Sequence, residues 1–520
     1  MENARILWVD DEMESLKPHL LFLEARGFSL ETVNNASDAL QRIQEKAFDA
    51  VLLDEHMPGG GGLELLPKIK IIRPSLPVVM ITKSEEEGVM QEAIGAQISD
   101  YLLKPVHPIQ VLTSLTKLLA GAKLAGEHTQ NQYQQEFRDL SMEVNGAQTF
   151  EDWVRIHQAL SRWEIALDRS GNEAFVGLLK SQREEANTLF SRFIERNYQN
   201  WITEEGGAPL QIHRLLKKEL VPALRDGKKV ILLVLDNLRW DQWKVLQPLM
   251  ETAGRVDEEG VHASFLPTAT QYARNALFAG LTPLGISKRF PQYWVADRAD
   301  TEEGRNAYEE QLLGELLKTQ GLQDISWAYA KLTHQGSERK FLGTWANCKN
   351  KQFVAVVVNF IDMLSHAKAE QSIVRDLASS DAGYRALTVA WWENSPLRTW
   401  LVSALEMNFS ILLTTDHGTI MVEEPVKLAG DRDLTTNLRY KQGRLMQYNA
   451  KEAVRFEDSE KIGLPKRALG EAVVFAKGTD FFAYPNQYNY YAQHFRKTYQ
   501  HGGISLEEMI VPYVWLKSRS

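Results

Sequence analysis

Three aspartates stand at the ends of apolar runs that are far apart along the chain. Each run is rich in valine, isoleucine and leucine: Asp236 follows 230–235, Asp362 follows 353–361 and Asp416 follows 410–415. Such runs are typical of central strands in a parallel sheet. Because the carboxyl ends of parallel strands meet at one edge, we expect the three carboxylates to converge there.

Three histidines accompany these aspartates. His366 comes four residues after Asp362, His417 directly follows Asp416, and His501 precedes two glycines. Carboxylate and imidazole ligands together suit Zn²⁺ or Mn²⁺, and six protein ligands exceed what one tetrahedral ion needs. The pattern predicts two metal ions, which would offset three carboxylates and favour phosphoryl chemistry. The alternative for any one histidine is an ordinary core or surface residue.

Thr270 is the candidate nucleophile, in a segment (267–280) that indicates a turn entering a helix. A hydroxyl held by a metal ion can ionise near neutral pH, and the N–H groups of a helix start favour a phosphate. The alternative is that Thr270 simply caps the helix. Arg274 and Asn275 could bind a non-bridging phosphate oxygen, or they could only pack the helix.

A second set of polar residues follows short apolar runs near the N-terminus. It comprises Asp10, Asp11, Asp54, Thr82 and Lys104. A carboxylate that accepts a phosphoryl group needs a divalent cation, and a cationic and a hydroxyl side chain can hold the product oxygens. This set supplies those groups at the predicted carboxyl edge of a parallel sheet.

Length and composition limit the class of protein. The 520 residues predict three to four domains, and 44% hydrophobic with 24% charged residues is typical of folded proteins. The net charge of -9 argues against non-specific binding to duplex DNA. Cys348 is the one cysteine, and the chain shows no signal-peptide pattern and no apolar run of membrane-spanning length. We therefore expect a cytoplasmic protein without a membrane anchor.

The chain divides into three predicted segments. Residues 1–122 alternate strand and helix patterns, 123–206 predict a bundle of about three helices, and 207–520 predict a larger α/β domain with a central sheet. Two apolar stripes at helical spacing support the bundle: Trp153, Ile156, Leu160, Trp163 and Leu167, then Phe175, Leu178, Leu179, Ala186, Leu189, Phe190, Phe193, Ile194 and Trp201. Thr149 and Asp152 have capping-box spacing.

The first segment resembles a response-regulator receiver domain, which has a flavodoxin-like fold. The resemblance rests on the acidic pair Asp10-Asp11, on Asp54-Glu-His-Met, on Thr82 and on Asp100-Tyr-Leu-Leu-Lys-Pro. It implies a role for each position: Asp54 accepts the phosphoryl group, Asp10 and Asp11 bind Mg²⁺ together with Asp54, Lys104 pairs with the phosphoryl oxygens, Thr82 moves toward them and Tyr101 is the aromatic switch. It also implies a sensor histidine kinase as partner. Our hypothesis is that phosphorylation promotes a homodimer.

The third segment resembles the alkaline phosphatase superfamily, and more narrowly its PglZ-type domain. Carried over residue by residue, the resemblance implies two zinc sites: Asp236, Thr270, Asp416 and His417 for one, and Asp362, His366 and His501 for the other. Thr270 would be the covalent phosphoryl acceptor. Threonine stands where alkaline phosphatases proper have serine, as in the phosphodiesterase branches, so simple monoester hydrolysis is not the expected reaction.

Receiver, bundle and PglZ-type domain in this order resemble the PorX-type response regulators. That resemblance implies control of type IX secretion. The expected activity is hydrolysis of nucleotide-like phosphodiesters, with short linear or cyclic oligonucleotides as one class, because tyrosines at 272, 484, 488, 490 and 491 offer faces for stacking bases. Equally, these tyrosines could belong to a core or a dimer interface.

Two other functions stay open at this point. One is a non-catalytic adaptor, stabilised by metal, that contacts transcription machinery such as a sigma factor. The other is direct binding of a specific DNA sequence, which the net charge disfavours. The helices near 150–200 also lack the localised basic face of a recognition helix.

Overall fold

The structure is a computed structural model that describes residues 4–13, 16–57, 61–83, 98–170, 173–203, 207–296, 304, 306–370, 380–431, 434–486 and 488–519. The chain divides into two compact units. One comprises residues 1–138, 163–179 and 377–390, and the other comprises residues 139–162, 180–376 and 391–520.

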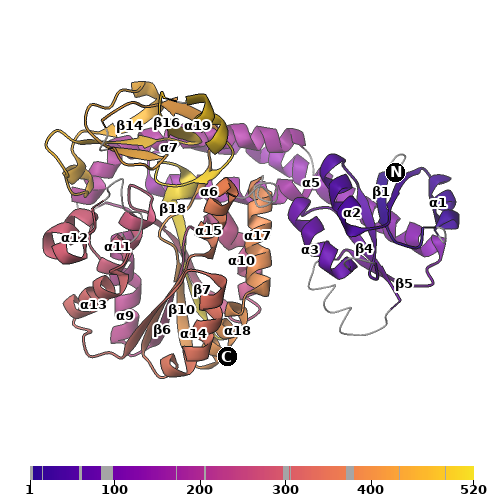
Figure 1. Ribbon diagram of the computed structural model, residues 1–520, viewed down its shortest axis with the longest axis horizontal. Coiled ribbons are helices and arrows are strands. Elements are labelled where there is room, and N and C mark those ends of the chain that lie inside the picture. Colours follow the sequence, from indigo (N-terminus) through magenta and orange to yellow (C-terminus); the bar gives the residue numbers. More distant parts are fainter. Residues whose placement is uncertain are drawn as a thin grey trace. The chain divides into compact units, whose positions relative to one another are not determined.

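The N-terminal sheet is parallel, with strand order β2-β1-β3-β4-β5. Its elements are β1 (Ala4–Val9), α1 (Lys17–Glu24), β2 (Phe28–Val33), α2 (Ala36–Glu45), β3 (Ala50–Asp54), α3 (Gly62–Ile72), β4 (Val78–Thr82) and β5 (Asp100–Leu103). Alternate residues of β1 enter two cores, one containing Leu7 and Val9 and the other Ile6 and Trp8. Helices therefore cover both faces of the sheet (Figure 1). This is the predicted flavodoxin-like fold.

Three long helices follow: α5 (Pro108–Gly146), α6 (Phe150–Ser170) and α7 (Glu173–Thr203). The predicted stripe from Trp153 to Leu167 is buried throughout. Leu178 of the second stripe is 49% exposed, because its neighbour Leu179 takes the buried face and adjacent helical residues point in different directions. The Thr149 hydroxyl accepts from the N–H of Asp152, whose carboxylate accepts from the N–H of Thr149, so the predicted capping box is present.

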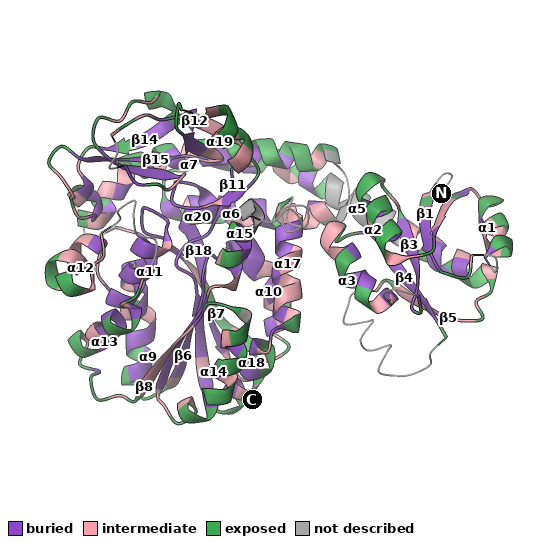
Figure 2. Cartoon of the chain, in the orientation of Figure 1, coloured by how far each residue is buried: buried purple, intermediate pink, exposed green. Residues whose placement is uncertain are grey.

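The large sheet has strand order β7-β18-β10-β6-β9-β8. Its strands are β6 (Lys229–Leu235), β7 (Arg255–Ala263), β8 (Trp327–Leu332), β9 (Phe353–Val358), β10 (Phe409–Thr414) and β18 (Ile510–Lys517). Strands β10, β6 and β9 are parallel, as the three apolar runs predict, and β8, which the sequence analysis did not identify, is parallel to β9. Strand β18 is antiparallel to β10 and β7. The central strands are buried along almost their whole length (Figure 2).

Helices flank both faces of this sheet (Figure 1). The described helices and helical turns of residues 212–406 are α8 (Ile212–Leu215), the π-helical turn η1 (Leu216–Leu220), α9 (Val221–Arg225), α10 (Trp240–Met250), α11 (Thr270–Ala279), α12 (Pro283–Arg289), the 3-10 turn η2 (Pro291–Tyr293), α13 (Glu309–Thr319), α14 (Gln335–Cys348), α15 (Phe360–Glu370), α17 (Asp381–Asn394) and α18 (Leu397–Glu406).

Between β10 and β18 the chain forms three small sheets, β11-β17, β12-β16 and β13-β15-β14. Their elements are β11 (Ile420–Met421), β12 (Glu424–Lys427), β13 (Tyr440–Gly443), η3 (Ala450–Glu452), β14 (Ala453–Phe456), η4 (Ser459–Ile462), β15 (Ala472–Ala476), β16 (Asp480–Ala483), α19 (Tyr488–Phe495), β17 (Tyr499–Gln500) and α20 (Leu506–Met509).

The segment boundaries predicted at 122 and 206 stay predictions, since residues of the three long helices belong to both compact units. Among the described helices, none combines the length and the apolar composition needed to cross a membrane.

Candidate active site

The carboxyl ends of β6, β9 and β10 lie at one edge of the large sheet because the three strands are parallel neighbours. Asp236 directly follows β6, and Asp416 comes two residues after β10. Asp362 differs from the sequence expectation in one respect. Strand β9 ends at Val358, so that Asp362 lies in the first turn of α15 and not at a strand end. His366 lies one turn further along that helix.

Asp236, Asp416 and His417 form the first cluster, in which one ligand atom of each lies within 4.8 Å of the others. All three side chains are inaccessible to solvent. Asp416 Oδ1 accepts from the backbone N–H groups of Asn237 (3.3 Å) and His417 (3.1 Å). Asp236 Oδ1 and Asp416 Oδ2 accept no hydrogen bond from any described residue.

The burial of these carboxylates is electrostatically costly. It raises the pKa of Asp236 well above its usual value and also raises that of Asp416, although Arg274 opposes both shifts. Buried carboxylates need a cation or donors to stay charged. Two orphaned carboxylate oxygens and an imidazole within 4.8 Å fit a divalent cation such as zinc.

Asp362, His366 and His501 form the second cluster. Asp362 Oδ1 lies 3.4 Å from His366 Nε2 and 3.6 Å from His501 Nε2. Burial would raise the pKa of Asp362, but the neighbouring histidines hold it below its usual range. Burial, with His417 nearby, lowers the pKa of His501 to about 3. His501 is therefore neutral near pH 7, as a metal-binding imidazole must be.

Backbone carbonyls set the tautomers of two histidines. His501 Nδ1 lies 3.2 Å from the carbonyl oxygen of Thr268, and His417 Nδ1 lies 3.1 Å from that of Gly418. A carbonyl oxygen only accepts, so each Nδ1 carries the proton. Each Nε2 then presents its lone pair to the site, His501 toward Asp362 and His417 toward Thr270.

Thr270 is the first residue of α11, and its Oγ1 lies 3.1 Å from His417 Nε2. The N-cap position belongs to Ala269, and no side chain caps the helix. The alternative that Thr270 merely caps α11 is therefore wrong. The Asn306 side-chain amide, from outside α11, donates to the Thr270 carbonyl oxygen at 3.0 Å and so stabilises the first turn of this helix.

Arg274 and Asn275 make their contacts inside the protein. Arg274, 1% exposed, donates to Asp236 at 2.5 Å and to Glu309 at 2.7 Å. Asn275, also buried, donates to the Gln271 carbonyl oxygen. Neither side chain lines the cavity next to Thr270, so these contacts give no support to the predicted direct binding of substrate. Arg274 instead balances the charge of the first cluster.

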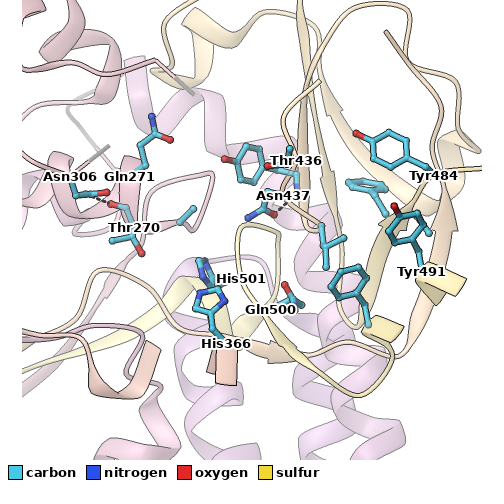
Figure 3. A pocket seen from close by; sticks show the side chains of 16 residues that line it. Thr270, Gln271, Asn306, His366, Thr436, Asn437, Tyr484, Tyr491, Gln500 and His501 are labelled. Atoms are coloured by element: carbon cyan, nitrogen blue, oxygen red, sulfur yellow. Dashed lines mark hydrogen bonds between the residues drawn. The ribbon is translucent and has the colours of Figure 1, made fainter. Parts of the chain in front are cut away.

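A cavity of about 490 Å³ opens beside Thr270 (Figure 3). Its polar wall includes Thr270, Gln271, Asn306, His366 and His501. Its opposite wall comes from the small sheets and α19 and is aromatic: Tyr440, Phe482, Tyr484, Tyr491 and Phe495.

Two of the tyrosines singled out from the sequence, Tyr484 and Tyr491, line this cavity. The others do not. Tyr272 is 2% exposed and packs on Tyr440, whereas Tyr490 is 61% exposed on α19. Tyr488 donates its hydroxyl proton to the Pro425 carbonyl oxygen.

Sequence reasoning missed several residues of the site. Glu309 is the second partner of Arg274, and Asn237 donates to Asp362 Oδ1 at 3.2 Å from a left-handed backbone conformation (φ 67°). A non-glycine residue at positive φ directly after a strand aspartate is uncommon. Asparagine tolerates a left-handed backbone better than most residues. The pair Asp236-Asn237 was therefore the one sequence signal for this part of the site.

The N-terminal cluster lies at the carboxyl edge of the small parallel sheet. Asp10, Asp11 and Asp54 each bring one carboxylate oxygen within 4.8 Å of the others. Lys104 Nζ lies 3.0 Å from both Asp10 Oδ2 and Asp54 Oδ1. Burial raises the pKa of Asp54, and so do the two neighbouring aspartates, while Lys104 opposes the shift. Three carboxylates facing one ammonium group fit an added divalent cation.

Thr82 and Tyr101 connect this cluster to the outer strand β5. The buried Thr82 hydroxyl donates to the carboxylate of Glu55, the residue after Asp54. Burial raises the pKa of Tyr101, whose hydroxyl interacts with Thr82. The two residues predicted to form the switch are therefore in contact.

Comparison with known protein families assigns all three segments. Residues 215–516 match the BREX system PglZ alkaline phosphatase-like domain, more than half of the chain. The chain belongs to the PglZ alkaline phosphatase-like family. Residues 6–116 match the response regulator receiver domain and residues 123–202 the PorX response regulator linker domain. A receiver, this linker and a PglZ-type domain together are the PorX-type architecture.

Individual relatives match a smaller part of this PglZ-family chain. The transcriptional regulatory protein ZraR of Klebsiella oxytoca is 33% identical over 24% of this chain and 28% of its own length. The alginate biosynthesis transcriptional regulatory protein AlgB of Pseudomonas putida is 35% identical, with the same coverage. The chain thus spans little more than a quarter of the length of these curated relatives. A CheY-like receiver domain from Methanospirillum hungatei is 29% identical, covering 23% of this chain and 96% of that one, with a TM-score of 0.23.

Proposed function

We propose that the protein is a response regulator whose PglZ-type domain is a two-zinc phosphodiesterase with Thr270 as nucleophile. The observation that carries this proposal is the position of Thr270. Its hydroxyl lies 3.1 Å from His417, beside a cavity that His366 and His501 also line (Figure 3). A hydroxyl next to residues that could hold a metal ion suits phosphoryl transfer through a covalent intermediate.

The proposed zinc ligands are the two clusters described above. Asp236, Asp416 and His417, with Thr270, would hold one ion; Asp362, His366 and His501 would hold the other. When bound, zinc supplies positive charge that lowers the pKa of a hydroxyl and stabilises phosphate oxygens. Mn²⁺ suits the same donors.

The chain's own residues then account for the reaction. Thr270 Oγ1 forms a bond to phosphorus while the bond to the leaving-group oxygen breaks; the hydroxyl proton goes to solvent, and the leaving group gains a proton from water. Water next displaces the threonine oxygen, which regains a proton. The start of α11 favours the phosphoryl group through its N–H groups. Arg274 donates to Asp236 and so favours its charged form.

The cavity supports a nucleotide-like phosphodiester as substrate. Its aromatic wall faces the polar wall that carries Thr270, so a base could stack while its phosphate lies at the threonine (Figure 3). Stacking on an aromatic side chain contributes roughly 1–3 kcal/mol per base. Short linear and cyclic oligonucleotides are the class to test first.

Phosphorylation at Asp54 by a sensor histidine kinase is the proposed input, with Mg²⁺ held by Asp10, Asp11 and Asp54. The match to a receiver domain supports the kinase partner. Phosphorylation adds about -1.5 to -2 charges beside Lys104 and Thr82, which would shift the Thr82–Tyr101 pair and promote a homodimer. A role in type IX secretion rests on the PorX-type architecture alone.

The deciding experiment combines metal analysis with turnover. We expect about two zinc ions per chain and hydrolysis of bis-p-nitrophenyl phosphate, with turnover lost and zinc largely retained in Thr270→Ala. Unchanged turnover in Thr270→Ala would rule out the nucleophile. A wild-type protein that binds zinc but has no activity would favour the metal-stabilised adaptor. One that has neither zinc nor activity would leave only signalling from Asp54 through protein contacts.

A further inference from the structure

Helix α7 belongs to the segment that matches the linker domain, yet it contacts the loop that carries His501. Asn187 of α7 is 2% exposed. Its Oδ1 accepts from the N–H of Leu506 at 2.7 Å, and its Nδ2 donates to Glu507 at 3.1 Å. The oxygen and the nitrogen of this buried side-chain amide thus both bond to one short stretch of the PglZ-type domain, at Leu506 and Glu507.

That stretch runs from His501 to Glu508, and backbone hydrogen bonds hold its two glycines in place. The N–H of Gly502 donates to Thr268 Oγ1 at 3.0 Å, and the N–H of Gly503 donates to Glu508 at 2.9 Å. Gly502 has φ 119°, a conformation that glycine alone adopts readily. The chain between His501 and Leu506 is therefore held at several points, and we expect a shift of Leu506 to pass along it to the histidine.

A buried ion pair holds the far end of the same stretch. Glu508 is inaccessible and pairs with Arg439 at 2.5 Å, while Ser505 donates to its carboxylate at 2.7 Å. Arg183, one turn before Asn187 on α7, lies 3.6 Å from Glu507. Helix α7 thus contacts this stretch through two hydrogen bonds of Asn187 and through the ion pair of Arg183 with Glu507.

We propose that Asn187 is a positioning residue for His501, so that the linker domain supplies part of the support of the second metal cluster. The proposal rests on the proposed zinc function. Packing between apolar surfaces tolerates sliding, whereas a buried hydrogen bond to a backbone N–H fixes its partner closely. Loss of a residue that orients a metal ligand weakens metal binding about 10–100-fold.

The test uses the full-length protein and zinc titration against a competing chelator. In Asn187→Leu, which has similar volume but no polar atoms, we expect one of the two zinc ions to bind about 10–100-fold more weakly and the other to be unchanged. His501→Ala should weaken the same ion, and adding Asn187→Leu to it should cause no further loss. Equal weakening of both ions would contradict the proposal.

Two matched variants separate positioning from general damage. Ser191→Ala, one turn along α7, removes a hydrogen bond that stays within the helix, so zinc binding should remain that of the wild type. The exchange Asn187→Asp with Glu507→Gln reverses donor and acceptor but keeps the net charge. It should keep zinc affinity within a few-fold of the wild type, whereas Asn187→Asp alone places a second carboxylate beside Glu507 and should weaken it.

Amide hydrogen exchange of the zinc-free protein provides a readout independent of metal and activity. The Leu506 amide should exchange faster in Asn187→Leu, as should its neighbours at 501–505, while Ser191→Ala should not differ from the wild type. Unchanged exchange together with unchanged zinc affinity would overturn the proposal. If the wild type binds no zinc, the proposed phosphodiesterase function fails, and accelerated exchange would still support positioning of this loop by the linker.

Discussion

Arg274 and Asp236 form an ion pair of 2.5 Å in which neither side chain is accessible to solvent. Arg274 also contacts Glu309 at 2.7 Å and lies 3.8 Å from Asp416. Burial would lower the pKa of Arg274, but these carboxylates hold it well above its usual value. One guanidinium thus contacts three acidic groups. Its removal leaves Asp236 and Asp416 buried without this counter-charge, whereas Glu309 keeps the Lys331 ammonium group at 3.1 Å.

We expect Arg274→Gln to destabilise the chelator-treated protein by about 3–5 kcal/mol, the usual cost of breaking a buried ion pair from one side. Added zinc should recover more stability in the variant than in the wild type, because a cation then replaces the lost charge. Unfolding followed by tryptophan fluorescence, with and without zinc, measures both effects. Arg455→Gln is the control, since Arg455 pairs with Glu457 at the surface and should contribute about 0–1 kcal/mol. An Arg274→Gln protein as stable as the control would contradict this account.

His157 on α6 makes stability depend on pH. Complete burial lowers its pKa to about 4, although Glu507 and Asp241 pull in the opposite direction and Arg183 and Arg239 add to the shift. The folded state therefore keeps His157 neutral, while the unfolded chain takes up a proton near pH 6.5. Its contribution is fully present above pH 6.5 and is lost as the pH falls toward 4.

His157→Gln cannot titrate, so the difference in stability between wild type and variant should change across this range. Relative to the variant, the wild type should lose up to about 3 kcal/mol between pH 7 and pH 4, from 1.4 kcal/mol per unit of pKa. Urea unfolding of both proteins at several pH values measures this difference. The other titrating groups are common to both proteins, so their contributions cancel. A difference that stays constant with pH would show that folding does not shift the pKa of His157.

The sequence predicts β6, β9 and β10 and the clustering of Asp and His residues near their ends because both have local signatures. An apolar run that ends in Asp236 or Asp416 places its carboxylate at a sheet edge, whatever the remainder of the chain does. The burial of Trp153 and its stripe follows from helical spacing in the same way. These features depend on a few neighbouring residues, so they can be read without the fold.

Other parts of the site depend on packing between distant segments. Glu309 and Asn306 come from a stretch without a motif and reach α11 only in the folded chain. Thr268 orients His501 through its backbone carbonyl, which every residue possesses. Arg274 was expected to bind substrate, but its guanidinium pairs with the buried Asp236. Sequence spacing alone does not show whether a side chain faces the cavity or a buried carboxylate.

The receiver cluster predicts that Asp54 alone accepts a phosphoryl group. With acetyl phosphate and Mg²⁺, Asp54→Asn should lose incorporation of label. Asp49→Asn, at the opposite end of β3, where its carboxylate accepts only the N–H of Arg5 in the described contacts, should behave as wild type. Beryllofluoride should raise the sedimentation coefficient of the wild type and leave Asp54→Asn unchanged. Incorporation that persists in Asp54→Asn would place the phosphoryl group elsewhere.

The aromatic wall of the cavity predicts a selective loss on Tyr491→Ala. Tyr491 lines the cavity opposite Thr270, whereas Tyr490, its neighbour on α19, is 61% exposed and does not line it (Figure 3). If a base stacks on Tyr491, its loss costs roughly 1–3 kcal/mol, or about 5–150-fold in kcat/KM for a dinucleotide. Methyl p-nitrophenyl phosphate, which carries no base, should be hydrolysed at nearly the wild-type rate. Tyr490→Ala should leave both substrates unaffected. Equal losses on the two substrates would mean that Tyr491 shapes the catalytic centre and does not bind a base.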